Sequence, residues 1–386
     1  MSRTYGRDYK RIVVKAGTSL LTKGTNNLDF QIINSLVDQI ASLQFRGKEM
    51  ILVSSGAVAA GREAINSLSH IDESNFRSLS ERQVLAAVGQ GKLMHVYEQS
   101  FASHGILVAQ ALVSRRDVND RLGYLNLRNT LSALLSSEVV PIINENDVVA
   151  VEELAGEVFG DNDNLSALIA NLVDADLLLI LGTVRGMYTK DPNLHEDAEI
   201  VPVVKKVDES IDLLGGPSSD DIGRGGMITK LEAARLATVS GVDVVIASGL
   251  EAGAINRGVS GENLGTLFES SVSSLESRKR WMLSKLSGGG EDRNIEVDSG
   301  AVLALTEGNT SLLPAGVIRS TSEFQRGDVV SVINLSRDVK AVGITNYSSE
   351  DIKRIAGVRS DMIEAILGYH YGDEVIHRDN LVLLVE

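Results

Sequence analysis

The chain has 386 residues, a length that suggests two domains rather than one. Hydrophobic residues make up 43% and charged residues 23%, which is typical of a globular enzyme rather than of a disordered chain. The net charge of −15 repels nucleic acid and anionic membranes, and the absence of cysteine excludes disulfides and thiolate chemistry. We find no apolar signal segment and no run of about 18 apolar residues, so we expect a soluble cytoplasmic protein.

Short apolar segments alternate with segments of helical periodicity through the first two-thirds of the chain. The predicted strands are, in chain order, 11–15, 50–53, 107–113, 139–143, 177–181 and 242–247. The predicted helices span 29–44, 82–104, 164–173 and 231–237. Continuous apolar strands that alternate with helices are typical of parallel sheets covered on both faces. We therefore predict an α/β fold with an open, largely parallel sheet sandwiched by helices.

The pattern changes near residue 270. A Ser-rich stretch, three consecutive basic residues and an S-G-G-G run predict a linker at 276–290. The segments that follow are shorter, and we expect strands at 295–297, 301–306, 329–334, 341–344 and 381–385. The sequence thus predicts a first domain over 1–275 and a small β-rich domain over 291–386.

Four turns that follow predicted strands or open predicted helices carry polar residues or glycines. They are K-A-G-T-S at 15–19, S-S-G-A at 54–57, D-N-D-N at 161–164 and the glycine-rich run 223–230. Taken singly, each is explained by a surface lysine, a helix cap or a flexible loop. Taken together, two lysines (Lys15 and Lys230), an aspartate to hold them and close-approaching glycine backbone predict phosphoryl transfer. Neither the Walker nor the Rossmann glycine pattern is present, so the sequence predicts a kinase without a P-loop.

The ordered motifs make this prediction specific. V-V-K-x-G-T-S, V-S-S-G-A-V-A-A-G, L-A-A-V-G-Q, P-I-I-N-E-N-D, G-D-N-D-N-L-S-A and G-G-M-x-T-K resemble the glutamate 5-kinase branch of the amino-acid kinase family, whose fold is carbamate kinase-like. R-K-R-W at 278–281 and segments such as S-L-L-P at 311–314 extend the resemblance through a PUA-like C-terminal domain. The resemblance therefore covers nearly the whole chain.

The resemblance implies transfer of the γ-phosphoryl group of MgATP to the γ-carboxylate of L-glutamate, the first step of proline biosynthesis. Lys15 and Lys230 would act in catalysis and Asp163 would organise them. Asp147 would pair with the α-ammonium group, while N–H groups and Asn would take the carboxylates. The glutamate-binding set is Ser55, Asp147 and Asn162. The nucleotide-binding set is Lys15, Gly17, Gly182, Thr183, Arg224, Gly225, Gly226, Met227, Ile228, Thr229 and Lys230.

Other expectations come from the family alone. The resemblance implies ATP and Mg²⁺ as cofactors, proline as a feedback inhibitor and a homo-oligomer. The residues that would hold Mg²⁺ are not identified. Two positions depart from the family pattern: Gly182-Thr183 replaces the usual Thr-Asp pair, and Arg224 replaces a small or hydroxyl residue. Both departures bear on nucleotide preference.

Two further hypotheses stay open from the sequence. A kinase of the same fold could use another acceptor, such as acetylglutamate, aspartate, carbamate or a nucleoside monophosphate. A regulatory RNA-binding protein with a decayed kinase domain is the other. Residues 291–386 carry 9 Lys and Arg against 16 Asp and Glu, a net charge of −7, and lack the basic footprint that RNA binding needs. We therefore expect no nucleic-acid partner and a structural or regulatory role for this domain.

Overall fold

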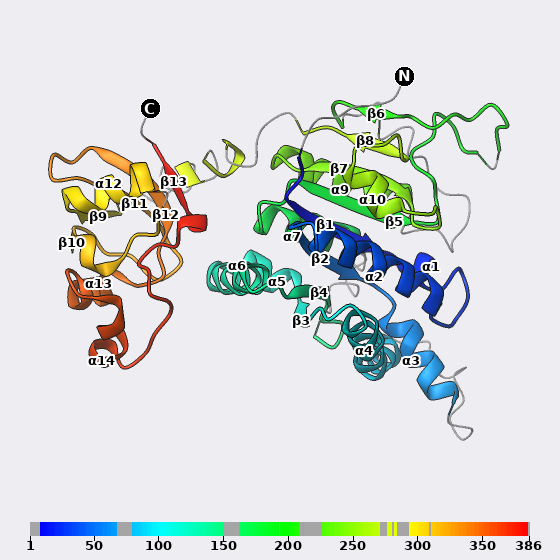
Figure 1. Ribbon diagram of the computed structural model, residues 1–386, viewed down its shortest axis with the longest axis horizontal. Helices are drawn as coiled ribbons and strands as arrows, with labels where there is room; N and C mark the ends of the chain where they lie inside the picture. Colours follow the sequence, from blue (N-terminus) through cyan, green and yellow to red (C-terminus); the bar gives the residue numbers. More distant parts are fainter. Residues whose placement is uncertain are drawn as a thin grey trace. The chain divides into compact units, whose positions relative to one another are not determined.

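The computed structural model describes residues 8–67, 79–149, 162–192, 194–207, 211, 226–270, 276–279, 282–283, 293–308 and 310–384. The chain forms two compact units (Figure 1). The first comprises Met1–Asn119 and Leu127–Ser274, and the second comprises Asp120–Asn126 and Leu275–Glu386.

An eight-stranded sheet forms the centre of the first unit, in the order β3-β4-β2-β1-β5-β7-β8-β6. The strands are β1 (Arg11–Ala16), β2 (Glu49–Ser54), β3 (Val108–Val113), β4 (Val140–Glu145), β5 (Leu177–Gly182), β6 (Val203–Val204), β7 (Asp243–Ser248) and β8 (Thr266–Phe268). All neighbours pair in parallel except β7 and β8. The chain builds one side of the sheet from β1 to β4 and the other from β5 onward, so the strand order reverses beside β1. Ligands of such sheets bind at the carboxyl ends of the strands at this reversal.

Helices cover the sheet on both faces. The helices up to residue 259 are α1 (Thr18–Leu21), α2 (Phe30–Gln44), α3 (Ala57–Asn66), α4 (Leu79–Ala102), α5 (Arg115–Asn119), α6 (Arg121–Ser136), α7 (Asn162–Leu172), α9 (Met227–Val239) and α10 (Ala254–Val259). The start of α6 belongs to the second unit. Buried side chains of α2, α4 and α10 share one core with alternate residues of β1, among them Ile12 and Val14. Helix α7 packs against β1 and β5, and α9 packs against α7 and β7. The predicted α/β fold with a largely parallel sheet is confirmed.

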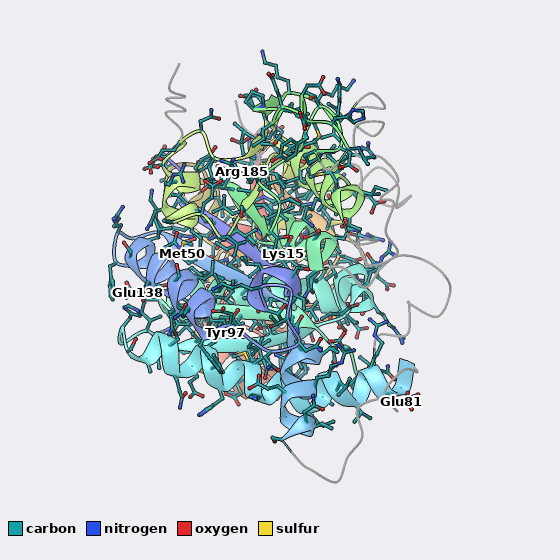
Figure 2. All side chains as sticks on the ribbon, turned by 90° about the vertical axis from the view of Figure 1, so that its right-hand side faces the viewer. Lys15, Met50, Glu81, Tyr97, Glu138 and Arg185 are labelled. Atoms are coloured by element: carbon teal, nitrogen blue, oxygen red, sulfur yellow. The ribbon has the colours of Figure 1, made fainter. Side chains whose placement is uncertain are left out.

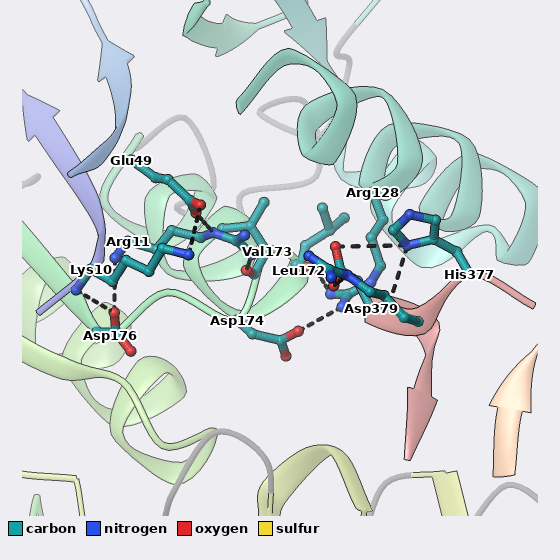
Figure 3. A network of polar contacts seen from close by, with 11 residues as sticks. Lys10, Arg11, Glu49, Arg128, Leu172, Val173, Asp174, Asp176, His377 and Asp379 are labelled. Atoms are coloured by element: carbon teal, nitrogen blue, oxygen red, sulfur yellow. Dashed lines mark hydrogen bonds and ion pairs between the residues drawn. The ribbon is translucent and has the colours of Figure 1, made fainter. Parts of the chain in front are cut away.

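The amino ends of the central strands are joined by charged side chains (Figure 3). Arg11 Nε donates to Glu49 Oε2 at 2.6 Å, and these two residues face each other in the β1–β2 register. Asp176 Oδ2 accepts from the backbone N–H groups of Lys10 and Arg11 at 2.7 and 2.8 Å. These bonds hold the residue before β5 against the start of β1. They therefore help to fix the register of the two strands, and with it the relative position of their carboxyl ends.

Two glycines let α3 and α4 cross in backbone contact. A Cβ atom on Gly89 of α4 would lie 1.8 Å from the carbonyl oxygen of Ala57, and one on Gly61 of α3 would lie 1.9 Å from that of Leu85. Such distances are far inside van der Waals contact, so only glycine permits this crossing. Because α3 begins directly after the Ser54–Gly56 turn, the crossing also fixes one of the predicted ligand-binding turns.

A five-stranded sheet of order β10-β9-β11-β12-β13 forms the second unit. Its elements are β9 (Asn294–Val297), α12 (Ser299–Gly308), β10 (Val317–Ser320), β11 (Val329–Ile333), β12 (Val339–Ile344), α13 (Ser349–Ile355), α14 (Ile363–Leu367) and β13 (Leu381–Leu383). Pairing is antiparallel except between β9 and β11. Its core includes Tyr347, which is fully buried, and Leu125 packs in a smaller cluster with Val342 and Val382.

One predicted element is wrong. Residues 301–306 were expected as a strand, but they lie within helix α12. The run A-V-L-A-L-T is apolar without a helical period, and a short apolar run does not distinguish a strand from a helix. The side chain of Asp298 accepts from the backbone N–H of Ala301 at 2.7 Å, so it satisfies one of the free donors at the start of this helix.

No helix in the described part of the chain combines the length and the apolar character that a membrane span requires.

Gly89→Ala tests the α3–α4 crossing. The added methyl group forces two backbones apart, and we expect a loss of about 2 kcal/mol or more in the free energy of unfolding. Gly91→Ala is the matched control, because its Cβ would meet nothing within 4 Å on the same helix. We expect that control to gain about 0.5–1 kcal/mol from helix propensity. Denaturant unfolding measures both, and equal effects of the two variants would contradict the packing argument.

Candidate active site

Lys15 lies near the carboxyl end of β1, on the sheet face that α7 and α9 cover. Side chains alternate along a strand, and Ile12, Val14 and Ala16 all belong to the core shared with α2. Lys15 therefore faces the opposite way, and its side chain is only 4% exposed. Figure 2 shows it inside the fold. A lysine is almost never buried to this extent without a partner.

That partner is Asp163, in the first turn of α7. Its side chain is fully buried, and its Oδ1 lies 2.5 Å from Lys15 Nζ. Its Oδ2 lies 2.9 Å from the Nζ atom of Lys230, which belongs to the first turn of α9. A carboxylate is favourable near a helix N-terminus, where the free N–H groups carry partial positive charge. The structure thus brings together the three residues predicted to act in catalysis.

The charges of this triad are strongly coupled. Burial by itself raises the pKa of Asp163, but the attraction of Lys15 and Lys230 outweighs it and lowers the pKa to about 2. The carboxylate is therefore ionised throughout the physiological range. Two ammonium groups share one carboxylate, so the triad keeps a net positive charge in a chain whose overall charge is −15.

Two predicted glycines lie next to the lysine side chains. A Cβ atom on Gly17 would lie 3.2 Å from Lys15 Nζ, and one on Gly182 would lie 3.7 Å from Lys230 Cε. The backbone N–H of Gly17 donates to Leu181 O at 3.2 Å, which ties the end of β1 to that of β5. Glycine leaves room beside an ammonium group for a phosphate oxygen. The departure Gly182-Thr183 thus lies beside Lys230, with Thr183 exposed.

The glycine-rich segment before Lys230 is described from Gly226 onward, and Arg224 and Gly225 lie outside the described residues. The Gly226 carbonyl oxygen accepts from Lys230 Nζ at 3.3 Å. Thr229 is buried, and its hydroxyl donates to Asp163 Oδ2 at 3.1 Å. Met227 is half-buried, while Ile228 is 49% exposed. Sequence reasoning gave Thr229 to the nucleotide and missed that its side chain holds Asp163.

Two of the residues predicted for glutamate are in direct contact. Asn162 Nδ2 donates to Ser55 Oγ at 2.7 Å, and Asn162 precedes Asp163 at the start of α7. Beneath this contact, Ser54 Oγ and the buried hydroxyl of Tyr97 share a hydrogen bond of 2.8 Å. Burial raises the pKa of Tyr97 to about 12, against the opposing effect of the Ser54 bond. The side chains beneath the Asn162–Ser55 contact are therefore buried and uncharged at neutral pH.

Asp147 belongs to a neighbouring cavity rather than to this contact. It lies in the turn after β4, where its carbonyl oxygen accepts from Gln83 Nε2 at 3.1 Å. The cavity has a volume of about 260 Å³, and its wall includes Asp147, Gln90 and Gln110. Gln90 Oε1 accepts from Asn144 Nδ2 at 2.8 Å, and Asn144 Oδ1 accepts from Asn162 Nδ2 at 3.0 Å. A chain of side-chain amides thus joins the wall of this cavity to Asn162.

Sequence reasoning missed Asn144 and Gln90. Asn144 was visible as the first residue of N-E-N-D, directly after an apolar strand, where a polar side chain reaches the ligand edge of the sheet. Gln90 was visible as the last residue of the motif L-A-A-V-G-Q, but its position inside the long helix α4 did not indicate that its side chain reaches Asn144.

Asp163→Asn tests the triad. Without the carboxylate, two buried ammonium groups lack their counter-charge, and we expect a loss of about 3–5 kcal/mol in the free energy of unfolding at pH 7. A depressed pKa stabilises the fold above the unfolded value of 3.8, and this contribution disappears as the pH falls toward 2. The difference between parent and variant should therefore be constant above about pH 5 and shrink below pH 4.

Urea unfolding at a series of pH values measures this difference. Asp197→Ala serves as the control, because Asp197 is 69% exposed and its ion pair with Lys190 lies at the surface. A pH-independent difference for Asp163→Asn would contradict the assignment.

The comparisons with known proteins agree with this geometry. The Amino acid kinase family model matches residues 10–248, and the PUA domain model matches residues 293–367. Glutamate 5-kinase of Dehalococcoides mccartyi strain 195 is 51% identical over 98% of this chain and 100% of its own length. Glutamate 5-kinase of strain CBDB1 is 50% identical, over 97% and 99%. Glutamate 5-kinase of Herpetosiphon aurantiacus is 46% identical, over 97% and 98%. The chain belongs to the amino acid kinase family.

Proposed function

We propose that this protein transfers the γ-phosphoryl group of ATP to the γ-carboxylate of L-glutamate, the first step of proline biosynthesis. The observation that carries the proposal is the buried Lys15–Asp163–Lys230 triad at the carboxyl ends of the strands. Relatives that match nearly the whole chain at about half identity bear the name glutamate 5-kinase, which favours glutamate over the other acceptors.

The proposed reaction needs positive charge rather than a strong base. The γ-carboxylate is already ionised at pH 7, because its pKa is about 4.3. One of its oxygens forms a bond to the γ-phosphorus while the bond from that phosphorus to the β,γ-bridging oxygen breaks, and ADP leaves with the electron pair. Lys15 and Lys230 offset the charge of the transferring group, and Asp163 fixes both ammonium groups before substrate arrives.

We propose the remaining roles from the motifs and the geometry. Ser55, Asp147 and Asn162 form the glutamate site, and Gly17, Gly182 and the segment that leads to Lys230 form the nucleotide site. Gly17 and Gly182 are supported by the space that they leave beside the lysines. Thr183, Arg224, Gly225, Met227 and Ile228 rest on the sequence alone.

The described residues contain no cluster of protein ligands to which Mg²⁺ can be assigned. No group of three His, Asp or Glu side chains that could hold a metal occurs there, and both oxygens of Asp163 face lysines. Mg²⁺ commonly keeps its waters and binds through substrate phosphates. We therefore assign the metal to the phosphates of the nucleotide.

Proline as a feedback inhibitor, a homo-oligomer and a cytoplasmic location are further expectations from the family. We also keep the division into a kinase domain over 1–275, a linker over 276–290 and a PUA-like domain over 291–386. For the last of these, the net charge of −7 favours a structural or regulatory role over RNA binding.

The activity is tested by trapping the acyl phosphate with hydroxylamine. We expect a hydroxamate that requires both nucleotide and L-glutamate, and parallel reactions with ATP and GTP report the effect of Gly182-Thr183. A folded protein that forms no hydroxamate with either nucleotide would refute the proposal.

Asp147→Ala tests the glutamate site. Loss of a charged hydrogen bond to the α-ammonium group should raise the KM for glutamate about 10- to 100-fold, with a much smaller change in the KM for ATP. Asp197→Ala again serves as the matched surface control. Unchanged glutamate affinity in Asp147→Ala would show that this carboxylate does not bind substrate.

A further inference from the structure

Charged side chains hold helix α7 at both of its ends. Its first turn carries Asp163, which faces Lys15 on β1 and Lys230 on α9. Its last turn is held by two arginines, Arg11 from β1 and Arg128 from α6 (Figure 3). Because a helix moves as a rigid element, the contacts at its last turn also determine where its first turn lies.

A Schellman motif ends α7 and satisfies two of its last four carbonyl oxygens. Residues 170–173 carry the four carbonyl groups that have no donor within the helix. The backbone N–H of Ala175 donates to Ala170 O at 2.8 Å. The backbone N–H of Asp174 donates to Asn171 O at 3.3 Å. The carbonyl oxygens of the last two positions therefore need donors from elsewhere.

Both of these carbonyl oxygens accept from an arginine. Arg128 Nη1 donates to Leu172 O. Arg11 Nη1 donates to Val173 O. Cationic donors are favourable at a helix C-terminus, where the free carbonyl groups carry partial negative charge. All four terminal carbonyl oxygens of α7 are thus hydrogen-bonded, two of them by guanidinium groups that come from other elements of the first unit.

Arg128 is buried in order to make its contact. Its side chain is 2% exposed, and its Nη2 donates to Asp174 Oδ2 at 2.6 Å. Asp174 has a φ of +50°, the left-handed conformation that a Schellman motif requires and that glycine usually supplies. The aspartate takes the place of glycine here and provides a counter-charge for the guanidinium group. A buried ion pair is a weak source of stability, which points to a role in placing α7.

Arg11 and Lys15 hold opposite ends of α7 from one strand. Both lie on the same face of β1, and their separation of four residues spans about 13 Å along a strand. Asp163 and Val173 are ten residues apart, which spans about 15 Å along a helix. The two spans nearly match, so β1 fixes the axial position of α7 at both ends of the helix.

We propose that Arg11 and Arg128 are positioning residues for phosphoryl transfer, which hold the C-terminus of α7 so that Asp163 stays in register with the two lysines. The inference rests on the proposed function and adds two residues to it. Each arginine acts through α7, because it contacts the end of the helix that lies away from the triad. A shift of α7 by about 1 Å would move the triad by a similar distance, and a misplacement of this size can lower a rate about 100-fold.

Arg11→Met is the milder test, because the Arg11 side chain is 20% exposed and methionine keeps much of its length. The variant removes the donor to Val173 O. We expect kcat to fall about 3- to 10-fold, with the KM values for glutamate and ATP within about twofold, because the triad acts on the transferring group. Hydroxamate formation under saturating and limiting substrate measures both quantities.

Glu49→Gln is the matched control for Arg11→Met. Glu49 Oε2 accepts from Arg11 Nε at 2.6 Å, so this variant removes the charge of the other Arg11 partner. Glutamine keeps an oxygen for that N–H group and leaves the bond to Val173 O in place. We therefore expect Glu49→Gln to retain kcat within about twofold of the parent value.

Arg128→Met tests the buried arginine. It removes the donor to Leu172 O and a charged partner of Asp174, and we expect kcat per folded molecule to fall about 10- to 100-fold. Arg128→Lys keeps one charged donor and should recover part of this loss. Both variants are assayed well below their unfolding temperature, as monitored by circular dichroism, so that loss of folded protein is not counted as loss of activity.

The outcomes distinguish the two proposals. If the parent protein forms no hydroxamate, the proposed function fails and this inference fails with it. If the parent is active and the folded Arg11→Met and Arg128→Met variants retain its kcat, the arginines only stabilise the fold and the inference alone is overturned. An equal loss of kcat in Glu49→Gln and Arg11→Met would also overturn it. Should Arg128→Met not fold, the comparison of Arg11→Met with Glu49→Gln decides.

Discussion

Two lysines from opposite parts of the chain meet on one buried carboxylate. Lys15 and Lys230 are separated by more than half of the sequence, and each places its ammonium group on a different oxygen of Asp163. Removing three charged groups from water is costly, and the cost is offset only when all three are in register. The ends of β1, α7 and α9 therefore cannot shift independently, and this constraint gives the candidate active site its shape before any ligand binds.

The rest of the first unit supports this constraint. Parallel pairing of β1 with β2 and β5 places the ends of three strands at one edge of the sheet, and the Arg11–Glu49 and Asp176 contacts fix the other ends. The close crossing of α3 and α4 holds the Ser54–Gly56 turn beside Asn162. A positive triad in a chain of charge −15 is a local arrangement, since the long-range field of such a chain repels anions. The phosphoryl donor and the phosphoryl acceptor are both anionic and repel each other. Cations that are already in place reduce this repulsion.

The site contains two kinds of polar order. Around Asp163 the order is electrostatic, and opposite charges hold one another. Around Asn162 it is directional, because amide groups are oriented by the backbone N–H of Glu145 through Asn144. An amide group with a fixed orientation presents either an N–H donor or an oxygen acceptor to a ligand. It can therefore distinguish a hydrogen-bond donor on the ligand from an acceptor more sharply than a charge can. Placing both kinds side by side suits a reaction that must fix an amino acid and a phosphate chain at once.

The sequence by itself determined the α/β class, the main strands and the residue types of the triad, because apolar periodicity and glycine turns are local properties. It also placed Lys15 and Asp163 at the ends of their elements. It misjudged 301–306, where a capping contact from Asp298 decides for a helix over a strand. Only the tertiary structure decided that Thr229 bonds to Asp163 and that Gln90 bonds to Asn144. Those facts depend on distances between residues far apart in the chain, and no local pattern of residues contains them.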